Sequence, residues 1–207
     1  MQIITIYPRG FGANAYALTE DGKTALVIDP SGSKVESELI TRGLTPAYVL
    51  LTHCHFDHVG GVSALQQSGA KVLCSEKTKT LIGTSADLFD AFGAPRTHFT
   101  VNETFQDNEE KILCGMRVQA IFTPGHTSGS VCYLVTDKQG GRYLFTGDTL
   151  FLGSVGRTDF PTGNIGELRA SLKRLSALDG DMPIYPGHNE PTTLDYERKT
   201  NPFLLDL

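Results

Sequence analysis

Apolar residues along the chain fall mostly in short runs that are bounded by glycine, proline or charged residues. Runs of this length with β-branched and aromatic side chains predict strands. In the first half the predicted strands are 2–7, 13–19, 24–29, 47–52 and 70–74, and in the second half they are 111–113, 117–122, 130–136 and 142–145, with a further short β-like run at 183–185. The chain therefore contains enough strands for two sheets.

Segments with a helical spacing of apolar residues separate these strands. The predicted helices are 33–42, 57–68, 165–178 and 192–205, with a broken helical segment over 76–92 and a glycine-rich loop over 150–164. Ser33 is the predicted N-cap of the first helix, and Gly43 follows its end. Strands and helices follow in the same coarse order in both halves. This order predicts one α/β domain over residues 1–207, an αββα sandwich of two mixed sheets packed face to face with helices outside.

Charge and hydropathy limit the partners of the protein. Its 207 residues carry a formal charge of -5 and no run of lysine or arginine, so we expect no nucleic-acid partner. No apolar stretch approaches the roughly 20 residues that cross a bilayer, and the N-terminus lacks the features of a signal peptide. We therefore expect a cytoplasmic protein without a membrane partner. The four widely spaced cysteines fit neither a disulfide framework nor a zinc ribbon, and the oligomeric state is open.

Histidines and aspartates gather directly after the predicted strands, where a rigid sheet can hold side chains around one point. These candidate metal ligands are His53, His55, Asp57, His58, His126, Asp148 and His188. Seven donors are too many for one tetrahedral zinc ion and suit two ions that share a bridging carboxylate. Cys54 lies between two of them, but strand alternation turns its side chain to the other face.

The sequence T-H-C-H-F-D-H over residues 52–58, with P-G-H at 124–126, G-D at 147–148 and P-G-H at 186–188, resembles the metallo-β-lactamase fold superfamily. The resemblance spans essentially the whole chain and implies the αββα fold. It also implies the ligand sets: His53, His55 and His126 for one metal, Asp57, His58 and His188 for the other, and Asp148 as the bridge.

Residues 147–161 and 197–203 resemble glyoxalase II (hydroxyacylglutathione hydrolase) and its short bacterial relatives. Metallo-β-lactamases proper often carry a cysteine where Asp148 stands, so the resemblance disfavours antibiotic hydrolysis. Full-length glyoxalase II has a C-terminal helical domain that helps to bind glutathione, and we expect this chain to lack it. The resemblance therefore implies a small-molecule thioester substrate such as S-lactoylglutathione more strongly than it implies glutathione recognition.

The implied cofactors are two divalent metal ions per chain, zinc by default and iron or manganese as alternatives. Such ions lower the pKa of a bound water, and the hydroxide would attack the thioester carbonyl. Asp57 would ligate the second metal and orient the hydroxide. For Arg157 two roles are open: contact with a carboxylate of the substrate, or an ion pair with Asp159.

The main alternative is a persulfide dioxygenase of the same superfamily. His53, His126 and Asp148 alone form a 2-His-1-carboxylate set that suits one non-haem iron. A lactonase would use the same metals for another ester, and a non-catalytic protein would be expected to have lost ligands. The number of bound metals and the uptake of oxygen distinguish the dioxygenase from the hydrolase.

Overall fold

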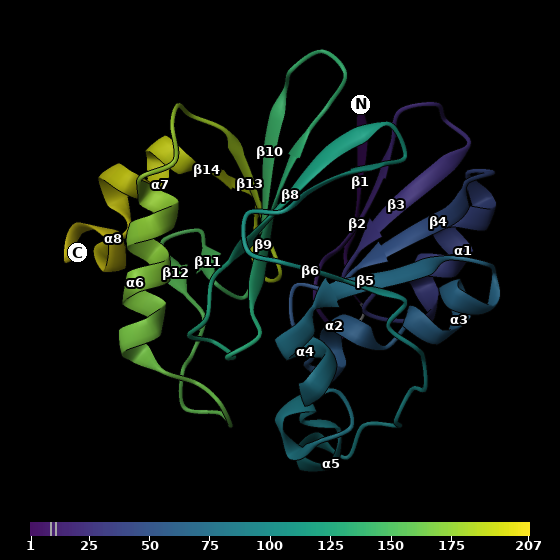
Figure 1. Ribbon diagram of the computed structural model, residues 1–207, viewed down its shortest axis with the longest axis horizontal. Coiled ribbons are helices and arrows are strands. Elements are labelled where there is room, and N and C mark those ends of the chain that lie inside the picture. Colours follow the sequence, from purple (N-terminus) through teal and green to yellow (C-terminus); the bar gives the residue numbers. More distant parts are fainter. Residues whose placement is uncertain (9, 11) are drawn as a thin grey trace.

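Two six-stranded sheets pack face to face in the computed structural model, which describes residues 1–8, 10 and 12–207 (Figure 1). In spatial order, the first sheet consists of β1 (Gln2–Ile6), β2 (Ala15–Thr19), β3 (Thr24–Ile28), β4 (Thr45–Leu50), β5 (Lys71–Ser75) and β6 (Glu103–Phe105). The second consists of β14 (Thr192–Thr193), β13 (Pro183–Pro186), β10 (Arg142–Gly147), β9 (Val131–Thr136), β8 (Met116–Phe122) and β7 (Glu110–Leu113). A separate short hairpin pairs β11 (Leu150–Phe151) with β12 (Ser154–Val155).

Helices lie outside both sheets (Figure 1). The helices of the first half are α1 (Ser33–Thr41), α2 (Phe56–Val59), α3 (Val62–Gln67), α4 (Glu76–Leu81), the 3-10 turn η1 (Ser85–Asp87) and α5 (Phe89–Phe92). Those of the second half are α6 (Ile165–Ser176), α7 (Leu194–Thr200) and α8 (Pro202–Leu205). Among the described residues, none of the helices combines the length and apolar character needed to span a membrane.

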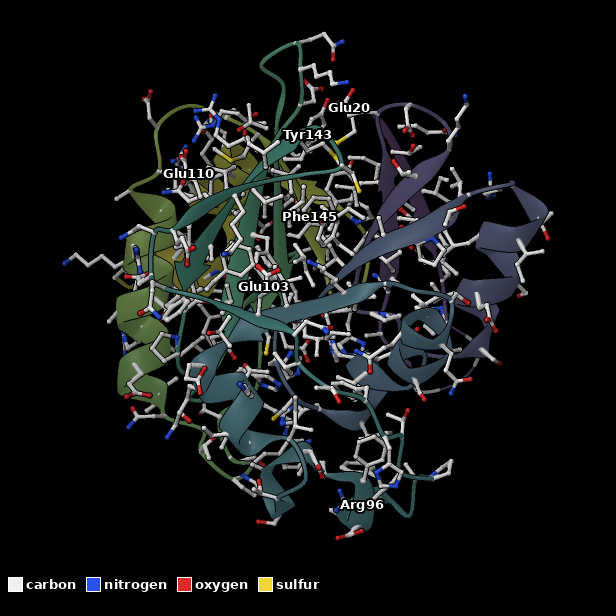
Figure 2. All side chains as sticks on the ribbon, turned by 45° about the vertical axis from the view of Figure 1, so that its right-hand side comes forward. Glu20, Arg96, Glu103, Glu110, Tyr143 and Phe145 are labelled. Atoms are coloured by element: carbon white, nitrogen blue, oxygen red, sulfur yellow. The ribbon has the colours of Figure 1, made fainter. Side chains whose placement is uncertain are left out.

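Three apolar layers hold the sandwich together, because successive side chains of a strand point to opposite faces. In β3, Val27 faces the layer under the helices of the first half, whereas Leu26 faces the layer between the sheets. In the second sheet, Phe145 lies in that inner layer (Figure 2), and Ile121 of β8 packs under α6. The predicted αββα sandwich is confirmed.

The direction of the strands places the loops that carry the candidate ligands at one edge. β8 and β10 each run antiparallel to β9, and β13 runs parallel to β10, so these three strands end at the same edge of the second sheet. In the first sheet, the loop after β4 meets this edge, where Val131 N donates a hydrogen bond to Thr52 O at 2.8 Å. The four loops that carry candidate ligands therefore converge.

Several local predictions were wrong. The predicted helix over 57–68 is two helices, because Gly61 N donates to Pro30 O at 2.7 Å in the loop before α1 instead of to a carbonyl of the helix. Gly60 and Gly61 pack against this loop so closely that a Cβ atom would collide with backbone oxygens of Ser31 and Gly32. The predicted N-cap Ser33 lies inside α1, and Gly32 occupies the cap without a side-chain hydrogen bond. The predicted loop over 150–164 contains the hairpin of β11 and β12, and the predicted helix over 192–205 begins only after β14.

Candidate metal centre

The structure brings all seven candidate ligands together at the convergent edge. The loop after β4 and the start of α2 supply four of them, and the loops after β8, β10 and β13 supply one each. Three sets have one ligand atom per residue within 4.8 Å of one another: a first trio of His53, His55 and His126, a second trio of Asp57, His58 and His188, and a mixed set of His53, His58 and Asp148. Asp148 lies between the two trios.

The first trio has the spacing of a single metal site. The Nε2 atoms of His53 and His126 each lie 3.0 Å from Nδ1 of His55. A tetrahedral zinc ion with Zn–N bonds of about 2.0–2.1 Å separates its ligand nitrogens by about 3.3 Å. The three nitrogens are therefore placed almost as one bound ion would require.

Asp148 faces both trios. Its Oδ2 atom lies 3.5 Å from Nε2 of His126 in the first trio and 3.5 Å from Nε2 of His188 in the second. Its Oδ1 atom lies 3.2 Å from Nε2 of His58. The second trio closes around Asp57, whose Oδ2 atom lies 3.3 Å from His188 Nε2. One carboxylate thus stands where a ligand shared by two ions would stand.

Hydrogen bonds behind the first trio fix which ring nitrogens carry lone pairs. The carbonyl oxygen of Arg157 can only accept, so His126 donates through Nδ1 at 2.7 Å. Thr52 Oγ1 gives its hydrogen to Asp29 and therefore accepts from His53 Nδ1 at 3.1 Å. The Nε2 atoms of His53 and His126 are then both unprotonated, and both point at His55 Nδ1. Because His55 Nδ1 carries at most one hydrogen, it can donate to only one of them. A cation satisfies all three nitrogens at once, whereas hydrogen bonding cannot.

Four buried side-chain atoms lack hydrogen-bond partners within the described part of the chain: His55 Nε2, His58 Nε2, Ser128 Oγ and Asp148 Oδ1. Two of them, His58 Nε2 and Asp148 Oδ1, lie 3.2 Å apart inside the cluster. Buried polar atoms are normally paired, and an orphaned pair of this kind calls for an explanation such as an ion. The donor set of imidazoles and carboxylates with these orphaned atoms fits two divalent cations.

The two trios differ in their electrostatics. Although burial opposes it, hydrogen bonds to Asp148 and Asp57 raise the pKa of His188 to about 9. The pKa of His58 also lies well above its ordinary value, because nearby carboxylates outweigh burial. Burial and neighbouring imidazoles lower the pKa of His55 to about 3. His53, whose pKa burial also lowers, and His55 therefore favour the neutral imidazole, whereas the second trio carries negative charge that a proton or a divalent cation offsets.

Asp29 is the residue of this site that the sequence prediction missed. It is buried at the end of β3 with φ 49°, and its carboxylate accepts from Thr52 N at 2.8 Å, Thr52 Oγ1 at 2.6 Å and His58 Nδ1 at 2.9 Å. Through Thr52 it orients His53, and directly it orients His58, so one carboxylate supports both trios. Its position directly after an apolar run, like that of the ligands, was the available signal.

The loop after β13 lies so close to the cluster that residue 187 must be glycine. A Cβ atom on Gly187 would collide with Asp148 Oδ1 and His58 Cε1. Backbone hydrogen bonds hold the loop there: Gly187 N donates to Gly147 O at 2.8 Å, and Asn14 N donates to Gly187 O at 2.7 Å. This close approach is what brings His188 into the second trio.

Arg157 forms an ion pair with Asp159, one of the two predicted roles. Its Nε and Nη2 atoms donate to the two carboxylate oxygens at 2.6 and 2.5 Å, and its guanidinium carbon lies 4.0 Å from the ring centre of Phe160. Contact with a substrate carboxylate stays a prediction.

Cys54 is buried, its thiol points to Ala86 O at 3.5 Å, and no ligand group among the described residues includes it.

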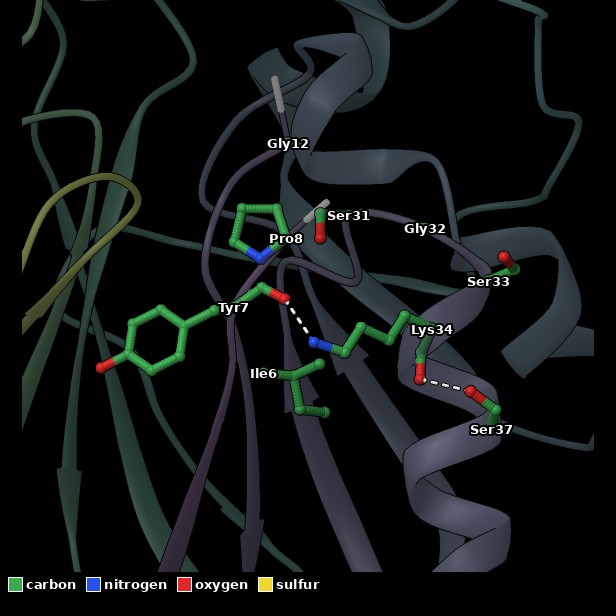
Figure 3. A pocket seen from close by; sticks show the side chains of 9 residues that line it. All are labelled: Ile6, Tyr7, Pro8, Gly12, Ser31, Gly32, Ser33, Lys34 and Ser37. Atoms are coloured by element: carbon green, nitrogen blue, oxygen red, sulfur yellow. Dashed lines mark hydrogen bonds between the residues drawn. The ribbon is translucent and has the colours of Figure 1, made fainter. Parts of the chain in front are cut away.

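A cavity of about 400 Å³ opens beside the candidate ligands and includes His55, Asp57, His126, Asp148 and His188 in its lining. A larger cavity of about 460 Å³ lies at the start of α1, where Lys34 Nζ donates to Tyr7 O at 2.9 Å (Figure 3). None of the seven candidate ligands lines that second cavity. The chemistry of the cluster therefore belongs to the smaller cavity.

The family model of the metallo-beta-lactamase superfamily matches residues 8–188. The chain belongs to this superfamily. It is 35% identical to the hydroxyacylglutathione hydrolase GloC of Haemophilus influenzae, over 99% of this chain and 98% of that protein. Both the predicted family and its metallo-hydrolase character are thereby confirmed.

Solved structures agree with this assignment. The BLEG-1 B3 metallo-beta-lactamase superimposes with a TM-score of 0.89 at 31% identity, covering 98% of this chain and 99% of that one. TTHA1623 in a di-iron-bound form superimposes with a TM-score of 0.83 at 35% identity, covering 99% of this chain and 100% of that one. The predicted fold is therefore that of these relatives, of which one is named as a beta-lactamase and the other is described with two iron ions bound.

Proposed function

We propose that this protein hydrolyses a thioester, such as S-lactoylglutathione, with two divalent metal ions held by the seven candidate ligands. The observation that carries the proposal is the placement of Asp148, whose Oδ2 atom lies 3.5 Å from a histidine of each trio. A carboxylate shared in this way suits a paired metal site. The similarity to GloC, named as a hydroxyacylglutathione hydrolase, supports a thioester as the substrate.

The first trio would hold one ion, the second trio the other, and Asp148 would bridge them. Bound divalent ions supply a water of lowered pKa and stabilise negative charge that develops on the carbonyl oxygen. Asp57 lines the cavity and is hydrogen-bonded to His188, so its carboxylate can orient the attacking water. A thiolate is a good leaving group, so the site needs no strong general acid.

The test is hydrolysis of S-lactoylglutathione by protein whose bound metals are counted in the same sample. We expect turnover with about two metals per chain, as a paired site requires. Asp57→Ala should abolish turnover while the circular dichroism spectrum stays unchanged. Asp206→Ala, at an exposed aspartate near the C-terminus, is the matched control and should keep full activity. Near-normal turnover by Asp57→Ala would remove Asp57 from the mechanism.

Two other substrates belong in the same assay. Nitrocefin tests β-lactam hydrolysis, the activity in the name of BLEG-1. Glutathione persulfide with an oxygen electrode tests the dioxygenase, which the di-iron-bound form of TTHA1623 makes worth measuring, because it shows that a similar site accepts iron. Oxygen uptake by protein with a single iron, without thioester turnover, would replace the hydrolase proposal.

A further inference from the structure

The cavity beside the ligands has a wall that thioester hydrolysis itself does not require. The ligand side chains form one part of its lining, and apolar side chains form most of the rest. These apolar residues are Phe56, Leu88, Phe92, Phe151, Val155 and Phe160. They come from α2, the segment around α5, the β11–β12 hairpin and the loop that follows it. Elements from both halves of the chain thus place apolar groups over the candidate metal centre.

Three of these rings, Phe56, Phe92 and Phe160, form a continuous aromatic wall. Phe92 stacks on Phe56 with ring centres 5.0 Å apart and meets Phe160 edge-on at 5.9 Å. Phe160 in turn meets the ring of His55 edge-on at 6.0 Å. The wall therefore leads from the first trio out to solvent.

Phe92 is the exposed end of this wall. Its side chain is 55% exposed, whereas its neighbour Phe89 is 4% exposed and packs in the core under the first sheet. α5, which carries Phe92, lies between two left-handed residues, Leu88 with φ 65° and Gly93 with φ 60°. A large exposed apolar side chain in a cavity, rather than scattered on the surface, marks a binding site.

Apart from the proposed metal ions, the cavity offers little to attract a charged substrate. Arg157 is the one cation among its described lining residues apart from the histidines, and Asp159 already neutralises it through two hydrogen bonds. Phe160 covers one face of the same guanidinium. The two carboxylates of glutathione would therefore find no free lysine or arginine within the described lining of this cavity.

We infer that the cavity receives an apolar group of the substrate, of the size of a phenyl ring or a branched alkyl chain, and that Phe92 determines this specificity. The cavity volume of about 400 Å³ lies in the range of small-molecule sites. For the reaction catalysed, the inference rests on the proposed thioester hydrolysis. For recognition, it rests on the aromatic wall alone.

The first experiment measures binding, so it does not depend on turnover. Phenylmethanethiol and 2-mercaptoethanol are titrated calorimetrically into the metal-loaded protein, because thiolates bind zinc and so place either probe beside the wall. We expect phenylmethanethiol to bind about tenfold more tightly, the factor for burying about 60 Å² of apolar surface. Equal affinities, or no measurable binding of the aromatic thiol, would overturn the inference.

Substitutions of Phe92 test whether the aromatic wall causes the preference for the aromatic thiol. Phe92→Ala should reduce the affinity ratio to about twofold or less, and Phe92→Leu should restore part of it, since an apolar surface is kept. Phe203→Ala is the matched control, because Phe203 is similarly exposed, at 45%, but belongs to α8 and does not line the cavity. A ratio that survives Phe92→Ala unchanged would remove Phe92 from recognition.

A second experiment separates this inference from the proposed function. Acetyl and phenylacetyl thioesters of one thiol, and acetyl thioesters of an aliphatic and an aromatic thiol, are compared by kcat/KM. A preference in one pair shows whether the acyl or the thiol part enters the cavity. If no thioester is cleaved while the affinity ratio holds, the hydrolase proposal fails and the apolar site stands. Cleavage of all four thioesters at equal kcat/KM, together with equal affinities for the two thiols, would support the hydrolase proposal and overturn the apolar site.

Discussion

Replacing Asp29 by asparagine changes one oxygen into an amide nitrogen and should disturb both trios. If the amide nitrogen takes the place of Oδ2, it faces two groups that now donate hydrogen bonds to that oxygen, Thr52 Oγ1 at 2.6 Å and His58 Nδ1 at 2.9 Å. Thr52 must then turn its hydrogen to His53 Nδ1, and His58 must give up the hydrogen on its Nδ1. Both histidines would carry a hydrogen on Nε2, the atom that faces the candidate metal centre.

The opposite orientation of the amide would also break a hydrogen bond. It would set the amide nitrogen against the backbone N–H of Thr52, which now donates to Oδ1 at 2.8 Å. Leaving a buried donor without an acceptor costs about 1–3 kcal/mol. Loss of a hydrogen-bond partner behind a metal ligand typically weakens metal binding by 10–100-fold, or about 1.4–2.7 kcal/mol. We therefore expect Asp29→Asn to lose at least one of two metals at limiting metal concentration.

The assay is competition with a chromophoric chelator, followed by metal analysis of the desalted protein. Asp137→Asn is the matched control: Asp137 is also buried, accepts from Gly141 N at 2.8 Å and Tyr143 Oη at 3.2 Å, and lies in the β9–β10 turn. Figure 2 places Tyr143 at the opposite end of the sandwich from Arg96, which forms ion pairs with Asp87 of η1 and Asp90 of α5. If Asp29→Asn binds two metals with the affinity of the unchanged protein, the orienting role of Asp29 is refuted.

Three further outcomes are expected. Gly187→Ala should bind fewer than two metals by metal analysis, because the added methyl group displaces Asp148 or His58; a full complement would show that the loop can move aside. The metal-free protein should lose stability as pH rises from about 6.5 to about 9, since the carboxylate of Asp148 raises the pKa of His188 above its ordinary value and the stabilisation disappears as the proton leaves. Thermal melts at both pH values check the sign, and a rise in stability would contradict it. Arg157→Gln should leave the metal content and the melting temperature unchanged, because its ion pair is exposed and its histidine contact is made by the backbone.

The sequence was sufficient to predict the layers and the group of seven candidate ligands that converge at one edge, because both depend on local patterns. Apolar alternation marked the strands, and His126 and His188 each followed such a run directly. In an αββα sandwich, strand ends of this kind converge at one edge, so residues far apart in sequence meet without any knowledge of their contacts.

Features that depend on distant backbone were not predictable in this way. The break between α2 and α3 involves the hydrogen bond from Gly61 N to the oxygen of Pro30, a residue of a distant loop before α1. The role of Asp29 needs the hydrogen bonds that join it to Thr52 and His58. For Arg157 the sequence left two partners open, because a substrate carboxylate and Asp159 satisfy the same guanidinium equally well.

The hydrogen bond between Asn14 and Gly187 has a consequence for the synthesis of the protein. The ribosome must add more than 170 residues after Asn14 before its partner exists, and His188 emerges with that partner. The second trio therefore cannot form on a nascent chain whose first sheet alone has folded, whereas two ligands of the first trio are already exposed. Until the last strands arrive, the growing chain therefore offers only part of the candidate metal centre, and the centre can be completed only late in synthesis.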